Sequence, residues 1–313
     1  MTRTGAEGLY SAIEEAAGLL DITPSREKVW PILTTYEDSL EQLVVAFRVT
    51  TRGKEDLDCR FTALPGDVNP YAYAVSKGLT PQTDHPVSTL LEDVQERLPV
   101  LAHGVDFGVV GGFKKTWTFI PPDNLQKLSK LADMPSMPRS LAENLGFYAR
   151  YGLDDKNSMI GIDYPSRTVN VYFLQFPAEC REPGTVRSML SDLGLPEPSE
   201  QLLQLAGQAV GIYTTLSWDS PKIHRITFAT MVPDVPGLPD RIAVDPRVET
   251  FARNIARTYP GPAQGLYNVA SYSGGEYFKL QSYYQLSENS LEGRVLLGPK
   301  GSGAAHASAA GGR

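Results

Sequence analysis

Five polar residues recur at nearly equal intervals in five strand-like segments, and this spacing constrains the fold more than any other feature. They are Asp58, Lys115, Asn170, Arg225 and Lys279, and successive members lie 57, 55, 55 and 54 residues apart. So regular a recurrence indicates one supersecondary unit that is repeated five times. The spacing therefore predicts that three cationic side chains from distant parts of the chain lie close together.

Each of the five residues falls in the second of two strand candidates that a short turn joins. The turns are rich in Gly, Pro, Asp, Asn or Ser, as in β-hairpins. The strand pairs are expected at 43–50 with 56–63, 102–109 with 113–120, 158–163 with 168–175, 209–217 with 223–231, and 264–272 with 276–285. Segments with helical period or caps are expected at 86–98, 138–149, 183–192, 198–208 and 246–257. The predicted fold class is α+β, built from five helix-helix-strand-strand units.

Alternation within the strands separates an apolar face from a polar one. Cys59 and Phe61, for example, alternate with Arg60, and alternate side chains of a strand point to opposite faces. The second hairpin breaks the pattern, because Phe113 has the same parity as Lys115. One interpretation is an open sheet whose polar face is wetted by solvent. We prefer a closed ten-stranded antiparallel barrel with helices outside, because closure removes exposed edges and leaves a lumen for a ligand.

The polar face carries a local cluster of positive charge in an acidic protein. The formal net charge is −7 and the pI is near 5.2, which argues against nucleic acid or a membrane surface as partner. Cations gathered in a lumen repel one another unless an anion joins them, and a mixture of Arg and Lys suits a diphosphate. The expected cations are Arg48, Arg60, Lys115, Arg225 and Lys279, with Asn170 and Tyr213 as neutral hydrogen-bonding groups.

The remaining inward positions are aromatic or thioether side chains. Aromatic faces can stack on a planar substrate or stabilise a carbocation. The residues expected there are Trp117, Met159, Tyr172, Tyr213, Tyr272 and Tyr283.

The length allows one large or two ordinary domains. The fivefold repeat predicts a single barrel domain over 1–297, followed by a disordered tail over 298–313. The tail is rich in Gly, Ala and Ser and has no apolar period. No run approaches the roughly 18 apolar residues that span a bilayer. We expect a cytoplasmic protein and a monomer, without a membrane or nucleic-acid partner.

At these residues the chain resembles the ABBA-type aromatic prenyltransferases of bacterial secondary metabolism, whose fold is called the PT barrel. The resemblance runs from about residue 14 to residue 284. It is carried by EEAAGLL at 14–20, KGLTP at 77–81, GGFKKTWTF at 111–119, PPDN at 121–124, PSMP at 135–138, ENLGFYARYGL at 143–153, VNVYF at 169–173, LSW at 216–218, KIHR at 222–225 and EYFKL at 276–280.

The resemblance implies a barrel in which an allylic diphosphate meets an aromatic acceptor. The residues implied to hold the diphosphate are Lys115, Asn170, Tyr213, Arg225 and Lys279. We assign catalytic roles to Lys115, Tyr213, Arg225 and Lys279, and substrate binding to Arg48, Asp58, Arg60, Trp117, Met159, Asn170, Tyr172 and Tyr283. Trp117 stands where a geranyl-transferring relative has tyrosine, and it can still face the cation or the acceptor.

Two departures from the family bear on Mg²⁺. A Mg²⁺-dependent relative holds its metal through an Asp that corresponds to Asp58, and it has Ser at the positions of Arg48 and Arg60. A guanidinium on either side of the carboxylate would take the space and supply the charge of a metal. We therefore expect no metal site and no required cofactor, with Asp58 orienting the arginines; the alternative is that the arginines point elsewhere and Mg²⁺ is retained.

The predicted function is transfer of a dimethylallyl or geranyl group from its diphosphate to an electron-rich aromatic molecule by Friedel-Crafts alkylation. One alternative is a barrel-shaped carrier that binds an anionic hydrophobic ligand without turnover. Another is a cyclase or hydrolase that acts on the allylic diphosphate alone. The sequence leaves the acceptor and the prenyl length open.

Overall fold

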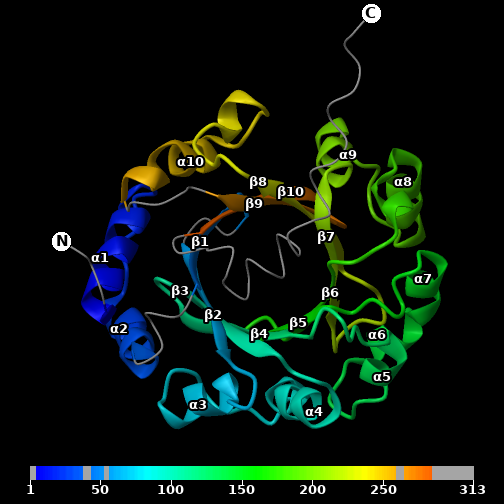
Figure 1. Cartoon of the computed structure of the whole chain (residues 1–313), viewed down its shortest axis with the longest axis horizontal. Coiled ribbons are helices and arrows are strands. Elements are labelled where there is room, and N and C mark those ends of the chain that lie inside the picture. Colours follow the sequence, from blue (N-terminus) through cyan, green and yellow to red (C-terminus); the bar gives the residue numbers. More distant parts are fainter. Residues whose placement is uncertain (1–4, 38–43, 53–55, 259–263, 284–313) are drawn as a thin grey trace, which may run out of the picture.

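The computed structural model describes residues 5–37, 44–52, 56–258 and 264–283. Ten strands form one closed antiparallel barrel, in the order β1-β10-β9-β8-β7-β6-β5-β4-β3-β2 (Figure 1). The strands are β1 (Val44–Thr50), β2 (Asp58–Pro65), β3 (Ala102–Gly108), β4 (Gly112–Phe119), β5 (Met159–Asp163), β6 (Thr168–Phe173), β7 (Ala209–Ser217), β8 (Arg225–Val232), β9 (Gly265–Tyr272) and β10 (Gly275–Tyr283). The five expected hairpins and the closed barrel are confirmed.

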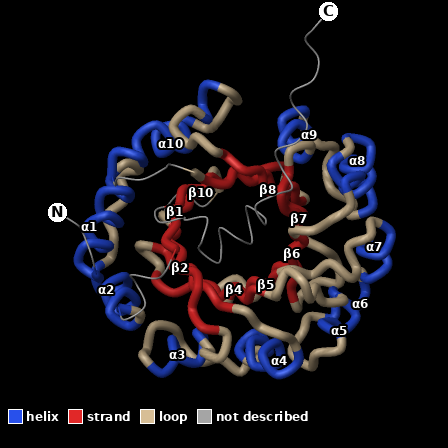
Figure 2. Tube along the Cα trace, in the orientation of Figure 1, coloured by secondary structure: helices blue, strands red, loops and turns tan. Residues whose placement is uncertain are grey.

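Helices surround the barrel and cover its outer face (Figure 2). The α-helices are α1 (Gly5–Gly18), α2 (Arg26–Thr35), α3 (Pro70–Ser76), α4 (Leu90–Arg97), α5 (Leu128–Ala132), α6 (Arg139–Glu143), α7 (Leu145–Arg150), α8 (Pro183–Asp192), α9 (Glu200–Ala206) and α10 (Pro246–Thr258). Short 3-10 turns are η2 (Pro86–Ser88), η3 (Ala178–Arg181) and η4 (Leu238–Asp240). Among the described residues, three α-helices lie between β4 and β5 and one lies between β8 and β9, so a uniform unit of two helices per hairpin is not confirmed.

The main hydrophobic core lies between the barrel and the helices. Cys59 and Phe61 of β2 are buried in it, while Arg60 faces the lumen. In α10 the buried residues follow one face at spacings of three and four, as an amphipathic helix requires. Tyr148 of α7 and Thr214 of β7 also share a hydrogen bond of 2.7 Å between their hydroxyl groups. The outward face of the barrel is therefore fixed by the helices, which leaves the inward face for the site.

A bulge in β4 explains why the second hairpin breaks the alternation. The register pairs Asp106 with Lys115 but Phe107 with Phe113, so Lys114 is an extra residue on β4. An extra residue turns the strand face over at that point. Phe113 therefore packs in the outer core while Lys115, of the same parity, lines the lumen.

The expected tail at 298–313 lies outside the described residues. Among the described helices, none is both long and apolar enough to cross a bilayer.

Candidate active site

The barrel encloses a cavity of about 720 Å³. Its walls come from strands on every side of the barrel, because each strand turns alternate side chains inward. Tyr272 lines the cavity, as expected. So do all twelve residues that the sequence analysis assigned to catalysis or substrate binding: Arg48, Asp58, Arg60, Lys115, Trp117, Met159, Asn170, Tyr172, Tyr213, Arg225, Lys279 and Tyr283. Side chains far apart in sequence thus meet in one lumen.

Two of the five cations are already neutralised by carboxylates. Arg48 Nη2 lies 2.7 Å from Asp58 Oδ2, and Arg48 Nη1 lies 3.0 Å from Asp106 Oδ2. Arg60 Nε donates to Asp106 Oδ1 at 2.8 Å. Asp58 was expected to orient both arginines, and it pairs with Arg48. Arg60 pairs instead with Asp106, which was not predicted from the sequence.

Asp106 is the centre of this ion network and is almost fully buried, at 1% exposure. Burial alone would raise its pKa, but the Arg60 and Arg48 guanidinium groups outweigh burial and hold the pKa far below its ordinary range. The sequence carried a signal for this residue, since Asp106 is flanked by the apolar Val105 and Phe107 in an expected strand. The same alternation that placed Arg60 inside places Asp106 inside.

Lys114, the extra residue of the β4 bulge, extends the network on the other side of Asp58. Its Nζ lies 2.7 Å from Asp58 Oδ1 and 2.8 Å from Asp56 Oδ2. Both oxygens of Asp58 therefore accept charged donors, one from Arg48 and one from Lys114. Burial would raise the pKa of Asp58, but these two cations lower it below its usual value.

The other three cations, Lys115, Arg225 and Lys279, form no ion pair with a carboxylate of the described residues. Burial lowers the pKa of Lys115 well below its ordinary value, although Asp163 and Asp106 oppose the shift. Burial also lowers the pKa of Lys279, to about 8, with Arg225 and Arg48 acting in the same direction. In this part of the cavity a bound anion would balance positive charge that no carboxylate of the described residues pairs with.

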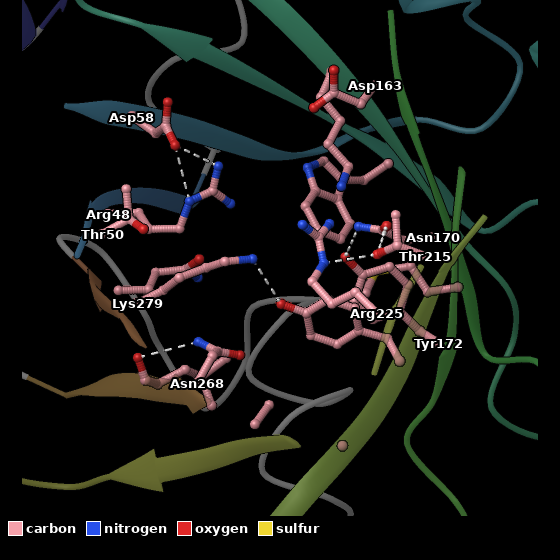
Figure 3. Close-up of a pocket in the computed structure, with 18 of the residues that line it drawn as sticks. Arg48, Thr50, Asp58, Asp163, Asn170, Tyr172, Thr215, Arg225, Asn268 and Lys279 are labelled. Atoms are coloured by element: carbon pink, nitrogen blue, oxygen red, sulfur yellow. Dashed lines mark hydrogen bonds and ion pairs between the residues drawn. The ribbon is translucent and has the colours of Figure 1, made fainter. Parts of the chain in front are cut away.

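A chain of hydrogen bonds holds Arg225 of β8 to the adjacent strands β7 and β6 (Figure 3). Arg225 Nε donates to Thr215 Oγ1 at 3.0 Å, and Thr215 Oγ1 donates to Asn170 Oδ1 at 2.7 Å. Asn170 Nδ2 in turn donates to Tyr172 Oη at 3.0 Å. Across the lumen, Lys279 Nζ donates to Tyr213 Oη at 3.2 Å. Thr215 was also missed, although it lies two residues after Tyr213 on the same strand face.

Aromatic rings form the wall next to these polar groups. Tyr172 and Tyr213 stack with centroids 4.4 Å apart, and the Trp117 centroid lies 5.0 Å from that of Tyr172. The Trp117 ring already has Arg60 Cζ at 3.9 Å and Lys115 Nζ at 4.1 Å from its centroid. Its π-system is therefore engaged by the protein's own cations, so the expectation that it faces a substrate cation is weakened.

The cavity also has an apolar part. Trp117, Phe119, Met159, Tyr172 and Tyr213 form one buried cluster with Ala102. Val44, Ala46, Leu266 and Tyr283 form a second. The lumen thus has a charged part suited to a diphosphate and an apolar part suited to a prenyl chain and an aromatic ring.

Known proteins of the same kind match the chain over nearly its whole length. The family model for "Aromatic prenyltransferase Orf2" matches residues 4–293. Flaviolin linalyltransferase of Streptomyces virginiae is 48% identical over 280 residues, which cover 89% of this chain and 92% of that protein. The 5,10-dihydrophenazine-1-carboxylate 9-dimethylallyltransferase of Streptomyces anulatus is 48% identical over 279 residues, 88% of this chain and 92% of that protein.

Solved structures share the fold at low sequence identity. A 6-dimethylallyl tryptophan synthase superimposes with a TM-score of 0.56 at 12% identity, covering 90% of this chain and 96% of that one. The 5-dimethylallyl tryptophan synthase of Streptomyces coelicolor, in complex with DMASPP and Trp, gives 0.54 at 10% identity, covering 90% and 95%. These structures show the fold alone. The match to the family model and the 48% identical relatives show that the chain belongs to the aromatic prenyltransferase Orf2 family of bacterial ABBA-type enzymes.

Proposed function

We propose that this prenyltransferase moves a dimethylallyl or geranyl group from its diphosphate to an electron-rich aromatic small molecule, without a requirement for Mg²⁺. The observation that carries the proposal is the set of three cations, Lys115, Arg225 and Lys279, that have no carboxylate partner among the described residues. Their positive charges can balance the negative charge of a diphosphate ester. Two of the relatives carry names that specify linalyl and dimethylallyl transfer, which supports a short allylic donor.

The three cations would act chiefly on the leaving group. The bond between the allylic carbon and the diphosphate oxygen breaks, and its electron pair departs with the diphosphate. Positive groups that are held in place before the reaction stabilise this developing charge without reorganisation, and in many enzymes such stabilisation contributes most of the rate enhancement. Arg225 is held so by Thr215 and Asn170, and Lys279 by Tyr213.

The apolar part of the lumen would hold the cation and the acceptor. The stacked Tyr172 and Tyr213 rings border the cations and offer negative π-faces to an allylic carbocation. A ring carbon of the acceptor supplies the electron pair for the new carbon-carbon bond, and the ring then loses its proton to the released diphosphate or to water. A closed barrel keeps bulk water from trapping the cation first.

The residues around Asp58 do not fit a Mg²⁺ ion. Mg²⁺ needs oxygen ligands in a near-octahedral arrangement, yet each oxygen of Asp58 and of Asp106 accepts a hydrogen bond or ion pair from Arg48, Arg60 or Lys114. The described residues hold no group of three or more His, Cys, Asp or Glu side chains that could bind a metal. The arginines supply the positive charge at this position, so no step is assigned to a metal.

The test is an assay of the full chain with dimethylallyl or geranyl diphosphate and a panel of hydroxynaphthalenes and dihydrophenazines, with and without EDTA. We expect prenylated product and an equal amount of released diphosphate in both conditions. Binding of the diphosphate without product from any acceptor would favour a carrier. Terpene alcohol formed at the same rate without an acceptor would favour a hydrolase. We further propose that the enzyme is a monomer, which its elution volume would test.

A further inference from the structure

Two buried N–H donors of the cavity wall have no hydrogen-bond partner among the described residues. They are Trp117 Nε1 and Gln281 Nε2. Buried donors are nearly always paired in folded proteins, because an unpaired one loses its water and gains nothing in return. An unpaired donor on a residue that lines a ligand cavity therefore points to a group that the ligand brings.

Gln281 lies at the border between the charged and the apolar parts of the lumen. On β10 it follows Lys279 by two residues and precedes Tyr283 by two, so all three share the inward face. The register places it directly opposite Arg48 of β1 on one side and Leu266 of β9 on the other. The side chain is buried, at 3% exposure for the residue. The amide therefore lies between the apolar part, where the aromatic ring of an acceptor would bind, and the charged part, where the diphosphate would bind.

Asn268 brings a second amide to the same wall. It lies opposite Lys279 in the β9 and β10 register, one inward position from Leu266, and it is buried at 7% exposure. Among the described residues its Nδ2 donates only to the Leu266 carbonyl oxygen, at 3.5 Å, which is the outer limit of a hydrogen bond. Figure 3 shows Asn268 next to Lys279 on one side of the cavity, facing Arg225 and Tyr172. Gln281 and Asn268 are diagonal neighbours on adjacent strands, within reach of one ligand group.

We propose that Gln281, assisted by Asn268, binds an oxygen substituent of the aromatic acceptor and so selects the ring carbon that is prenylated. This inference deepens the proposed function and rests on it. A primary amide carries a donor and an acceptor side by side, so it can bind a phenol oxygen or a ring carbonyl. If Gln281 holds one oxygen of the acceptor and the acceptor ring lies flat against the aromatic wall, only a few orientations bring a ring carbon to the allylic cation.

The neutral amides suit an acceptor rather than the diphosphate. The residues directly opposite Gln281 are Arg48 and the apolar Leu266, and Arg48 is neutralised by Asp58 and Asp106. The cross-strand neighbours of this amide therefore offer no unpaired charge to a multiply charged anion. The cations without a carboxylate partner among the described residues are Lys115, Arg225 and Lys279 instead. Loss of Gln281 should therefore change the use of the acceptor and leave the use of the diphosphate alone.

The test compares Gln281→Leu with the native enzyme, using dimethylallyl diphosphate and 1,3-dihydroxynaphthalene. Leu keeps the approximate volume and removes the amide. We expect the KM for the acceptor to rise about 10-fold, the usual scale for one lost hydrogen bond in a buried site, and the ratio of regioisomers to change. The KM for the diphosphate should stay constant. Gln208→Leu, the same change at an exposed position, is the matched control.

A second variant separates hydrogen bonding from shape. Gln281→Glu keeps the shape but replaces the donor by a carboxylate. It should accept a hydrogen bond from 1,3-dihydroxynaphthalene, yet repel 2-hydroxy-1,4-naphthoquinone, which is an enolate at neutral pH. We expect a much larger loss of binding for the quinone than for the diol. Equal losses for both ligands would contradict the proposed contact.

Stability and binding measurements keep the outcome distinct from that of the proposed function. Because the Gln281 donor is unpaired, Gln281→Leu should not lower the Tm; a lower Tm with an unchanged acceptor KM would assign the residue to packing and overturn the inference. If the native enzyme yields no product, binding of 1,3-dihydroxynaphthalene by equilibrium dialysis, with dimethylallyl thiolodiphosphate present, decides the question. Weaker binding to Gln281→Leu would support the contact, and equal binding would refute it.

Discussion

Arg48 and Asp58 lie directly opposite each other in β1 and β2, with Nη2 and Oδ2 only 2.7 Å apart. This ion pair determines the charge balance of the lumen, because the Asp58 carboxylate is then not free to bind a cation from solution. Lys114 takes the second oxygen of Asp58. Of the two guanidinium groups expected to flank Asp58, Arg48 bonds to it, while Arg60 bonds to Asp106.

Removing Arg48 should make the enzyme responsive to Mg²⁺. In Arg48→Ser one oxygen of Asp58 loses its donor, and the lumen loses a positive charge that a divalent ion can replace. We expect lower activity without metal and partial recovery with millimolar Mg²⁺, whereas the native enzyme should be equally active with EDTA and with Mg²⁺. An Arg48→Ser enzyme that ignores Mg²⁺, or a native enzyme that EDTA inactivates, would contradict the charge replacement.

Removing a cation that lacks a carboxylate partner should act on the chemical step. Arg225→Ala and Lys279→Ala each delete one positive group that is aimed at the leaving diphosphate. We expect kcat/KM to fall by about 10²-fold or more in each, the usual scale for losing one preorganised donor. Steady-state release of diphosphate measures the effect, and Arg187→Ala, at an exposed position, provides the control. Native rates in both variants would remove these residues from the site.

The activity should decline as the pH rises through about 8. Burial lowers the pKa of Lys279 to about 8, and Arg225 and Arg48 contribute in the same sense. Below this pH the empty site holds the ammonium form that binds the diphosphate, and above it the amine is neutral. We expect the KM for the diphosphate to increase about ten-fold between pH 7 and pH 9, in inverse proportion to the protonated fraction of Lys279. In Lys279→Arg the guanidinium stays charged, so an identical pH profile there would assign the decline to another group.

Loss of Asp106 should destabilise the fold. In Asp106→Asn the buried Arg48 and Arg60 lose the carboxylate that they share. Breaking a buried ion pair typically costs about 3 kcal/mol or more in the free energy of unfolding. Urea denaturation at pH 7 measures this loss. Asp106→Glu, which keeps the charge, should recover part of it; an Asp106→Asn protein as stable as the native one would show that the network is not stabilising.

Asp106 should also affect how the free energy of unfolding changes at low pH. The pKa of Asp106 is lower in the folded protein than its ordinary value of about 4. Its contribution to stability is therefore complete above pH 4 and is lost as the pH falls below that value. Native protein should lose unfolding free energy more steeply than Asp106→Asn below pH 4, and parallel curves would contradict this origin.

Most of the barrel could be predicted because a strand has a period of two. Once Cys59 and Phe61 were assigned to the outside, Arg60 had to face the lumen, and the equal spacing supplied four further landmarks. The expected strand limits agree with the structure to within a few residues. The short α3 was not predicted, although Asn69 caps it and Pro70 begins it. A helix of seven residues is too short for its apolar positions to show a clear helical period.

The pairing of charges could not be predicted from alternation alone. That Arg60 meets Asp106 depends on the β2 and β3 register, which sets these residues opposite each other. The register also depends on bulges, such as the one at Lys114, that no spacing rule located. Alternation therefore assigned side chains to the lumen, but three-dimensional pairing decided which cations remain available to a substrate.

The pairing of β1 with β10 joins segments from opposite ends of the barrel sequence, for example Ala46 with Tyr283. During synthesis on the ribosome the final hairpin is made last, so β1 and β10 cannot pair before then. Every incomplete chain therefore exposes two strand edges whose peptide groups have no hydrogen-bond partner. Catalytic competence should consequently emerge in a single late event, and any prematurely terminated polypeptide that lacks β10 should be both inert and prone to aggregate.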